Sequence, residues 1–467
     1  MLYLFFIICD RINMEMVRMA TIKKDNEKEV EKKKSSIKKR VSRKKIDKEE
    51  KKDNKKKNGF IDRVKKIVNG NKKRKKKEVY SDRDVITVML FSLGLGFIIC
   101  FVCLSLFIGK NYFSVIHDLK KVVDTYYTIV DNYYGDLDKN KLVDGAIEGM
   151  IGSVGDVFTS YSDTNSAESF NDTINGSYEG IGCTVATYSD GSIVVIDIFE
   201  GSPSDKAGLK INDKIIKVDN ISYLDKTGNE LANYIKNSGK SSVTLTIVRE
   251  DSEIDININL EKVEIPYVSS RVIEKEGKKI GYIGITLFSD NSYKQFKDKI
   301  EELEKNGIDG LVIDVRDNNG GYLTSVTDIC SLFLDKGKVI YGLEDSKGVE
   351  NKKDKTKEKR EYDIAVVING GSASASEILA SAIKESYGGY VVGTTSYGKG
   401  TVQQTKKLLD GSMIKFTTQK WLTPQGNCID GVGVAPTNFV ELSEEYYNNP
   451  GMDTDNQINE AVNLLIK

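Results

Sequence analysis

The hydrophobic pattern between Ile364 and Gln403 predicts a strand, a tight turn and a helix. Its first five residues are continuously apolar and partly β-branched, as in a buried strand. Asn369, Gly370 and Gly371 then interrupt the run, as a turn would. From Ala375 onward, apolar residues recur with the spacing of an amphipathic helix, at positions 375, 378, 379, 382 and 383. The pattern therefore places a strand–turn–helix corner just before Ala375, where free backbone N–H groups collect.

Three serines occupy this corner, at positions 372, 374 and 376. A second strand-like run, Tyr390–Gly393, leads into a loop that holds Lys399 between two glycines. A serine on such a corner with a lysine nearby is a known arrangement for acyl transfer. The chain has one histidine, His117, so a Ser–His–Asp triad or a His-ligated zinc site is hard to build and lysine is the natural base. Such a lysine must be neutral, and burial would lower its pKa.

Two further regions show organised patterns. Residues 279–288 read as a strand, a helix face follows, and residues 310–321 read as a buried strand that ends in Gly320 and Gly321, which implies an α/β layer with a parallel pair. Residues 177–261 contain short strand-like runs. There Gly180, Ile181 and Gly182 form a glycine-flanked loop whose N–H groups could bind a carboxylate, beside a strand edge that could accept a peptide. The alternative for this region is an all-β domain whose glycines only make turns.

The N-terminal third differs in composition from the rest of the chain. Residues 21–80 carry 27 Lys and Arg against 10 Asp and Glu, although the whole chain has a formal net charge of zero. This basic block is too polar to form a core, so we expect residues 1–84 to be a disordered tail. The block could bind anionic lipid head groups or, less in keeping with the rest of the chain, nucleic acid. We favour its interpretation as a positive-inside topology signal and expect no nucleic-acid partner.

Val85–Gly109 is a run of 25 residues without a charge, which is long enough to span a bilayer as a helix. The basic side precedes it, so we predict a single-pass membrane protein with a cytoplasmic N-terminus and an extracytoplasmic C-terminal part. Beyond this run lie Cys183, Cys330 and Cys428, an odd number without a CxxC pair or histidine partners. We expect buried free thiols, and neither a metal nor another cofactor.

The SASASE motif around the three serines, followed by the YGKG loop, resembles the C-terminal processing (tail-specific) serine peptidases. In that family the middle serine is the nucleophile and the base lies 25 positions later, which selects Ser374 and Lys399. The resemblance also implies that Gln403, four residues further on, holds the lysine amine. The Arg-x-Asn-x-Gly-Gly signature is matched from Arg316 to Gly321 and implies an oxyanion hole from Gly320 or Gly321 together with the N–H of Ala375.

The resemblance covers about residues 115–467 and includes DGAIEGM in the helical region. It also includes a PDZ-like stretch around Gly180, Ile181 and Gly182. In a PDZ domain this loop forms one wall of a peptide-binding groove, and a helix near Glu230–Ile235 would form the other wall. GDVFTSYSD departs from the family's usual Asp-Pro-Tyr version. We assign Glu377 and Asp314 to helix capping and local pairing rather than to acid–base chemistry.

These observations predict an α/β peptidase core with ClpP/crotonase-like layers and a β-rich PDZ domain, behind a transmembrane helix and a disordered tail. The expected segments are a tail (1–84), a membrane helix (85–109), a helical segment (113–172), a PDZ domain (173–261) and a peptidase core (262–467). The predicted function is a membrane-anchored serine endopeptidase that binds protein or peptide substrates with accessible C-termini. The alternative is a catalytically silent membrane scaffold that binds C-terminal peptides. The number of copies that assemble stays open.

Overall fold

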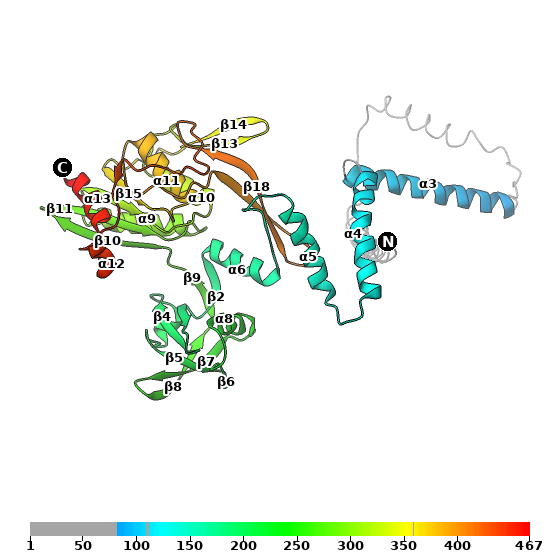
Figure 1. Cartoon of the computed structure of the whole chain (residues 1–467), viewed down its shortest axis with the longest axis horizontal. Helices are drawn as coiled ribbons and strands as arrows, with labels where there is room; N and C mark the ends of the chain where they lie inside the picture. Colours follow the sequence, from blue (N-terminus) through cyan, green and yellow to red (C-terminus); the bar gives the residue numbers. More distant parts are fainter. Residues whose placement is uncertain (1–81, 109–111, 358) are drawn as a thin grey trace, which may run out of the picture. The chain divides into compact units, whose positions relative to one another are not determined.

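The computed structural model describes residues 82–108, 112–357 and 359–467. The chain divides into two compact units, Met1–Tyr112 and Phe113–Lys467, and each is described by itself. The predicted disordered tail lies outside the described residues, apart from its last three positions. Figure 1 shows the elements of both units.

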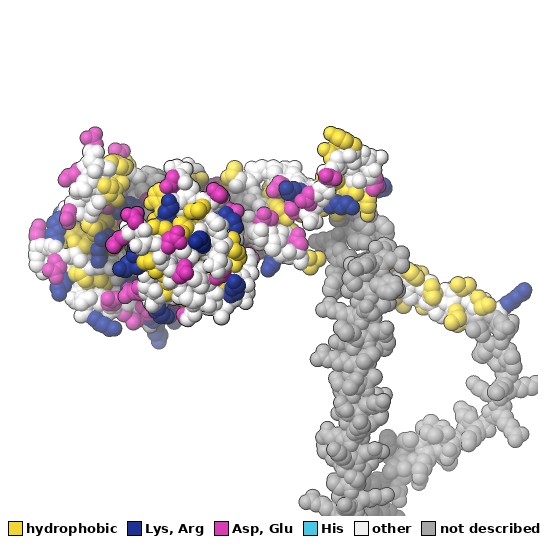
Figure 2. Space-filling view, turned by 90° about the horizontal axis from the view of Figure 1, so that it is seen from below, with side chains coloured by type: hydrophobic (Ala, Val, Ile, Leu, Met, Phe, Trp, Pro, Cys, Tyr) yellow, Lys and Arg dark blue, Asp and Glu magenta, His cyan; other side chains and the backbone are white. Residues whose placement is uncertain are grey.

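The first unit contributes helix α3 (Asp82–Ile108), which overlaps the predicted membrane segment. The side chains of residues 86–102 are all exposed, and Figure 2 shows hydrophobic side chains along this helix at the right. A search of the described residues finds no helix both long and apolar enough to cross a membrane. The predicted transmembrane segment is therefore not confirmed.

The C-terminal half of the second unit is built on a sheet with the strand order β10-β11-β12-β15-β16-β19. Only β10 and β11 pair antiparallel, and the other neighbours are parallel, which confirms the predicted parallel pair. The strands are β10 (Val268–Lys275), β11 (Lys278–Ile285), β12 (Gly310–Asp314), β15 (Asp363–Ile368), β16 (Tyr390–Gly393) and β19 (Asn438–Phe439).

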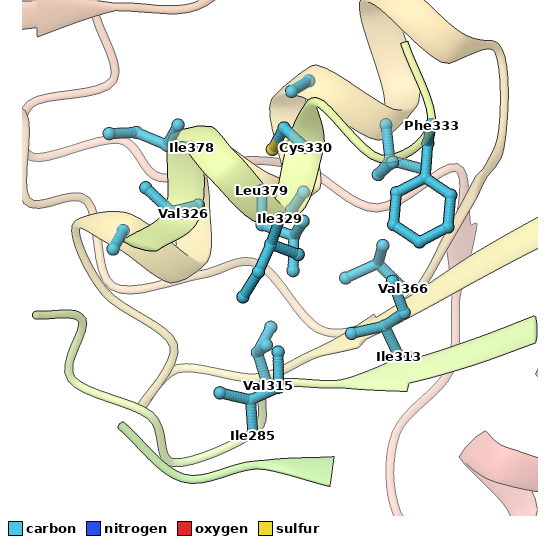
Figure 3. Close-up of a cluster of buried hydrophobic side chains, with 14 of the residues drawn as sticks. Ile285, Ile313, Val315, Val326, Ile329, Cys330, Phe333, Val366, Ile378 and Leu379 are labelled. Atoms are coloured by element: carbon cyan, nitrogen blue, oxygen red, sulfur yellow. The ribbon is translucent and has the colours of Figure 1, made fainter. Parts of the chain in front are cut away.

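Helices cover both faces of this sheet, because its central strands are apolar on both sides, as parallel strands usually are. One face packs against α9 (Ser292–Lys305), α10 (Leu323–Cys330) and α11 (Ala375–Ala382), which continues as the π-helical turn η1 (Ile383–Tyr387). Figure 3 shows side chains of α10 and α11, among them Ile329 and Leu379, directed toward Ile313 and Val366 of the strands. The other face packs against α13 (Asn456–Ile466) through Ile458, Ala461, Val462 and Leu465. The residues on either side of the corner between β15 and α11, Ile368 and Ala375, belong to this core.

A second sheet, with the order β1-β18-β13-β14 and β17 paired to β18, carries the lysine loop. Its strands are β1 (Ser160–Ser162), β13 (Val339–Asp345), β14 (Gly348–Lys353), β17 (Thr401–Lys407) and β18 (Met413–Leu422). The turn at Asp410–Gly411 joins β17 and β18. Strand β1 pairs with β18, so the chain just before Ser160 lies beside this hairpin. The remaining helices are α4 (Tyr112–Asn132), α5 (Lys139–Gly152) and α6 (Thr164–Asn175) of the N-terminal segment, and α12 (Glu444–Asn448) of the C-terminal half.

The residues between α6 and β10 form a small β-rich domain with its own core, which includes Val195, Leu231 and Leu245. Its sheet has the order β3-β4-β5-β7-β8, with β6 paired to β5, and a β2–β9 ribbon connects it to the rest. The strands are β2 (Ser177–Gly180), β3 (Cys183–Thr187), β4 (Ile193–Ile198), β5 (Lys214–Val218), β6 (Ile221–Ser222), β7 (Ser242–Arg249), β8 (Ser252–Asn259) and β9 (Glu261–Glu264). The helices are α7 (Pro203–Lys206) and α8 (Gly228–Asn237), and α8 contains the helix expected near Glu230–Ile235.

Candidate active site

Ser374 lies at the N-terminus of α11 with a backbone φ of 54° and ψ of −111°. A positive φ is rare for a residue with a side chain, and such strained backbone is a feature of functional sites. Ser374 is partly exposed, whereas Ser372 and Ser376 are buried. The Ser372 hydroxyl donates to the carbonyl of Val315 (2.7 Å), and the Ser376 hydroxyl donates to the carbonyl of Asn318 (2.8 Å). The Ser374 hydroxyl donates to no backbone carbonyl among the described residues, so it is the one suited to react.

The fully buried carboxylate of Glu377 joins the Ser374 corner to the lysine loop. Its Oε2 accepts hydrogen bonds from the backbone N–H groups of Ser374 (2.7 Å) and Lys399 (3.0 Å). Its Oε1 accepts from the N–H of Gly398 (2.7 Å) and the hydroxyl of Ser396 (2.6 Å). Four donors thus compensate the cost of burying this charge. The capping role assigned to Glu377 is confirmed, and its bridge to the lysine loop is an addition that the sequence pattern did not contain.

The Lys399 side chain is half-buried, and its Nζ lies 4.8 Å from the centre of the Phe158 ring. Burial lowers the pKa of Lys399 below its ordinary value of 10.5, and the positive charge of Lys415 adds to this effect. The carboxylates of Glu377 and Asp156 act in the opposite direction but do not outweigh burial. The lowered pKa is the property that a lysine base needs, so the expectation formed from the sequence agrees with the environment of this side chain.

Gln403 stands on β17 opposite Thr417 of β18. Its amide nitrogen donates to the hydroxyls of Thr401 (2.9 Å) and Thr417 (3.2 Å). Among the described residues, no hydrogen bond joins the Lys399 amine to Ser374 or to Gln403. Catalytic hydrogen bonds commonly tighten only when substrate is bound, and the roles of Ser374, Lys399 and Gln403 stay predictions.

Gly320 packs directly against the nucleophile corner. A Cβ atom at Gly320 would lie 2.8 Å from Ser374 Cβ and 2.9 Å from the carbonyl oxygen of Ala373, and its φ of 107° also favours glycine. The Gly320 N–H donates to the side-chain oxygen of the buried Asn318 (2.8 Å). The backbone carbonyl of Asn318 accepts the N–H of Ala373 (3.0 Å). The amide of Gly320 is therefore engaged, which favours Gly321 over Gly320 as the partner of Ala375 in the predicted oxyanion hole, and this hole stays a prediction.

Asp314 and Arg316 form a structural ion pair beside this region. Arg316 Nη2 lies 2.7 Å from Asp314 and 2.8 Å from Asp455, and Asp314 also accepts the hydroxyl of Tyr282 at 3.1 Å. The pairing role expected for Asp314 is confirmed. The interaction fastens β12 to the start of α13 rather than offering an acid or base to a substrate.

In the small β-rich domain, the loop Gly180–Gly182 is buried. The carbonyl of Ile181 accepts the N–H of Ser204 (2.8 Å), and the carbonyl of Gly182 accepts the Ser202 hydroxyl (2.9 Å). A Cβ at Gly180 would lie 2.4 Å from the ring of Tyr178, and burial raises the pKa of that tyrosine to about 12. Binding of a peptide carboxylate by this loop stays a prediction.

The three cysteines beyond α3 differ in exposure. Burial raises the pKa of the Cys330 thiol and raises that of the partly buried Cys183 to about 11, which makes both poor nucleophiles. Cys428 is exposed, so the prediction of buried thiols is wrong for this residue. It follows β18 in a surface turn, where a small side chain has little apolar surface to pack against.

Replacement of Glu377 by glutamine should destabilise the fold by about 1–3 kcal/mol and lower activity. A glutamine amide would place an NH₂ group against two of the four donors. In its better orientation it still faces the Gly398 N–H, and in the other it faces the N–H groups of Ser374 and Lys399. Thermal unfolding and cleavage rates would measure both effects. Glu385→Gln is the matched control, since among the described residues that carboxylate accepts a backbone N–H from Gln425 alone (2.9 Å). Equal melting temperatures for the two variants would contradict the bridging role.

Comparison with known proteins agrees with this site. The family model of peptidase family S41 matches residues 279–440, that of a PDZ domain matches 194–249, and that of the "Activating protease CtpB N-terminal domain" matches 109–166. The matched peptidase family and the serine at the strand–helix corner define a serine-type peptidase. The chain belongs to the carboxy-terminal processing proteases of family S41, which confirms the resemblance seen in the sequence.

Two of the similar relatives come from Bacillus subtilis (strain 168). Carboxy-terminal processing protease CtpB is 39% identical over 71% of this chain and 70% of its own length, and CtpA is 39% identical over 72% and 71%. Among solved structures, the photosystem II D1 C-terminal processing protease is 25% identical, with a TM-score of 0.41 over 69% of this chain and 86% of that chain.

Proposed function

We propose that the chain is an endopeptidase that cleaves protein substrates through an acyl-enzyme on Ser374, with Lys399 as the base. The observation that carries this proposal is the Glu377 carboxylate, which holds the backbone of both residues at once. It keeps a strained, partly exposed serine beside a lysine whose pKa is lowered by burial.

The reaction would follow from these positions. The neutral Lys399 amine takes the proton of the Ser374 hydroxyl as Oγ attacks the scissile carbonyl. The oxyanion that forms accepts hydrogen bonds from the N–H groups of Ala375 and Gly321. The Lys399 ammonium then gives its proton to the leaving amine, and water repeats the sequence on the acyl-enzyme to release the second product. Gln403 would hold the lysine amine through its side-chain oxygen.

We further propose that the PDZ domain binds substrate C-termini between β3 and α8, with the N–H groups of Gly180–Gly182 on the carboxylate. Support comes from the matched PDZ family and the glycine-flanked loop. The uncharged run Val85–Gly109 behind the basic block supports our proposal of a membrane anchor with the catalytic part outside the cytoplasm.

The test uses the full-length chain with casein and a fluorophosphonate probe that reacts with activated serines. We expect casein cleavage, and we expect mass spectrometry of the labelled chain to locate the probe on Ser374. Labelling of another serine would overturn the assignment. Neither cleavage nor labelling, also with added peptides that end in apolar residues, would favour the scaffold alternative.

A further inference from the structure

The turn that precedes β1 reaches the catalytic hairpin from a distant part of the sequence. Strand β1 pairs with β18 in the register Ser160↔Lys415, and this pairing carries Asp156 and Phe158 to the base of the β17–β18 hairpin. The turn lies within the N-terminal helical segment (113–172), which supplies none of the residues assigned above to the reaction.

Asp156 is hydrogen-bonded on both carboxylate oxygens. Its Oδ2 accepts the hydroxyls of Thr159 (2.5 Å) and Thr417 (2.6 Å), and its Oδ1 accepts the N–H of Phe158 (3.1 Å). Hydrogen bonds from Thr159 and then Thr417 hold the pKa of Asp156 below its usual value, so it stays an acceptor at neutral pH.

The Thr417 hydroxyl therefore has a fixed direction. It donates a hydrogen bond to Asp156, so its oxygen is free to accept one from the Gln403 amide, which donates from Nε2 at 3.2 Å. The Thr401 hydroxyl oxygen accepts a hydrogen bond from the second N–H of this amide at 2.9 Å. With both amide protons used, the Gln403 side-chain oxygen is left as the acceptor for an amine. Asp156 thus determines which end of Gln403 is available, through one intervening hydroxyl.

Phe158 contacts the Lys399 amine. The centre of its ring lies 4.8 Å from Lys399 Nζ, and the amine lies over the face of the ring. The charged groups that act on this amine are Asp156 before β1, Glu377 on α11 and Lys415 on β18. The short turn therefore contributes both an apolar cover and a negative charge to the surroundings of the lysine.

We propose that Asp156 and Phe158 are positioning residues of the Ser374–Lys399 reaction, Asp156 by orienting Gln403 through Thr417 and Phe158 by covering the Lys399 amine. The inference rests on the proposed function, and it gives the N-terminal helical segment a part in completing the site.

The two residues should shift the acidic limb of the kcat/KM profile in opposite directions. Asp156→Asn removes a negative charge near Lys399, so the amine loses its proton more readily and the limb moves to lower pH. Phe158→Ala admits water to the amine, and because burial is the largest cause of the lowered pKa, the limb moves to higher pH. A turn that was merely loosened would expose the amine in both variants and shift both limbs upward.

The rate separates the two parts of the inference. Asp156→Asn should also lower kcat, by roughly tenfold to 10²-fold, because Gln403 is no longer oriented. Thr417→Val should reproduce the loss in kcat without the downward pH shift, and Thr417→Ser should restore the rate. Phe158→Leu keeps an apolar cover and should shift the limb less than Phe158→Ala.

The matched control is Asp410→Asn at the far end of the same hairpin, where Asp410 accepts the N–H (3.0 Å) and hydroxyl (2.6 Å) of Ser412. This variant should keep the wild-type kcat and the wild-type position of the acidic limb of the kcat/KM profile. All variants are made in the full-length chain, and their melting temperatures are measured. Limbs that move together, or an Asp156→Asn variant that matches Asp410→Asn, would overturn the inference.

A second readout does not need cleavage. Competitive acetylation of lysines across pH, followed by mass spectrometry of the Lys399 peptide, reports the titration of this amine directly. Opposite shifts of its midpoint in Asp156→Asn and Phe158→Ala support the inference, and parallel or absent shifts overturn it. A failure of Ser374 labelling in the wild type would count against the proposed function alone.

Discussion

Ser374→Ala should lower kcat for casein cleavage by a factor on the order of 10⁴–10⁶ while the protein stays folded. Loss of the nucleophile in other serine peptidases has effects of this size, because the oxyanion donors and the binding groups alone retain little of the rate. The hydroxyl of Ser374 donates to no described backbone carbonyl, and the Glu377 N–H that its side chain caps also donates to the Ser374 carbonyl (2.9 Å), so its removal leaves no buried polar group without a partner. The melting temperature should therefore remain close to that of the wild type.

The two neighbouring serines provide matched controls with the opposite pattern. Ser372→Ala and Ser376→Ala remove buried hydroxyls that donate to the carbonyls of Val315 and Asn318. Each should cost about 1–3 kcal/mol of stability and far less activity than Ser374→Ala, because an unsatisfied buried carbonyl is expensive but lies outside the chemistry. Steady-state cleavage and thermal unfolding of the three variants measure both quantities. Residual wild-type activity in Ser374→Ala would point to another nucleophile.

The local pattern was sufficient to predict the corner that carries the serine. The change from a continuous apolar run to a helical period places the end of β15 and the start of α11 within a residue or two of the structure. The pattern could not choose among three serines in alternate positions. That choice came from the spacing to Lys399 in the family, and the structure adds the physical reason, since the outer two hydroxyls are used in packing the corner.

The contacts that determine the surroundings of Lys399 and the orientation of Gln403 could not be predicted from the sequence. Asp156 and Thr417 are 261 residues apart, and only the β1–β18 pairing brings them together. The strand β1 has three residues and no strong alternation, so no pattern identified it. Glu377 was recognised as a helix-capping residue, but its bridge to Lys399 depends on where the loop after β16 returns. Local periods therefore predict elements, while the electrostatic surroundings of Lys399 depend on the packing of three separate segments.

Lys399→Met should abolish activity and raise stability in the same protein. Without the amine no group takes the Ser374 proton, so we expect a loss of kcat on the order of 10⁴ or more. The wild-type enzyme should lose activity as pH falls, with an acidic limb below 10.5, because burial lowers the pKa of Lys399 and only its neutral form is a base.

The same lowered pKa fixes the sign of the stability effect. Between the folded pKa and the unfolded value near 10.5, the unfolded chain binds more protons at Lys399 than the folded chain, so the free energy of unfolding rises with pH across this window. Below the folded pKa the Lys399 amine is charged in its half-buried position, and the full cost of burying this charge then lowers the free energy of unfolding. Methionine has a similar length and no charge, so Lys399→Met should melt at a higher temperature than the wild type at neutral pH, and the difference should shrink as pH rises toward 10.5. Urea unfolding at a series of pH values measures this directly. A variant less stable than the wild type at neutral pH would show that the Lys399 charge contributes favourable interactions, and the neutral-base mechanism would lose its physical basis.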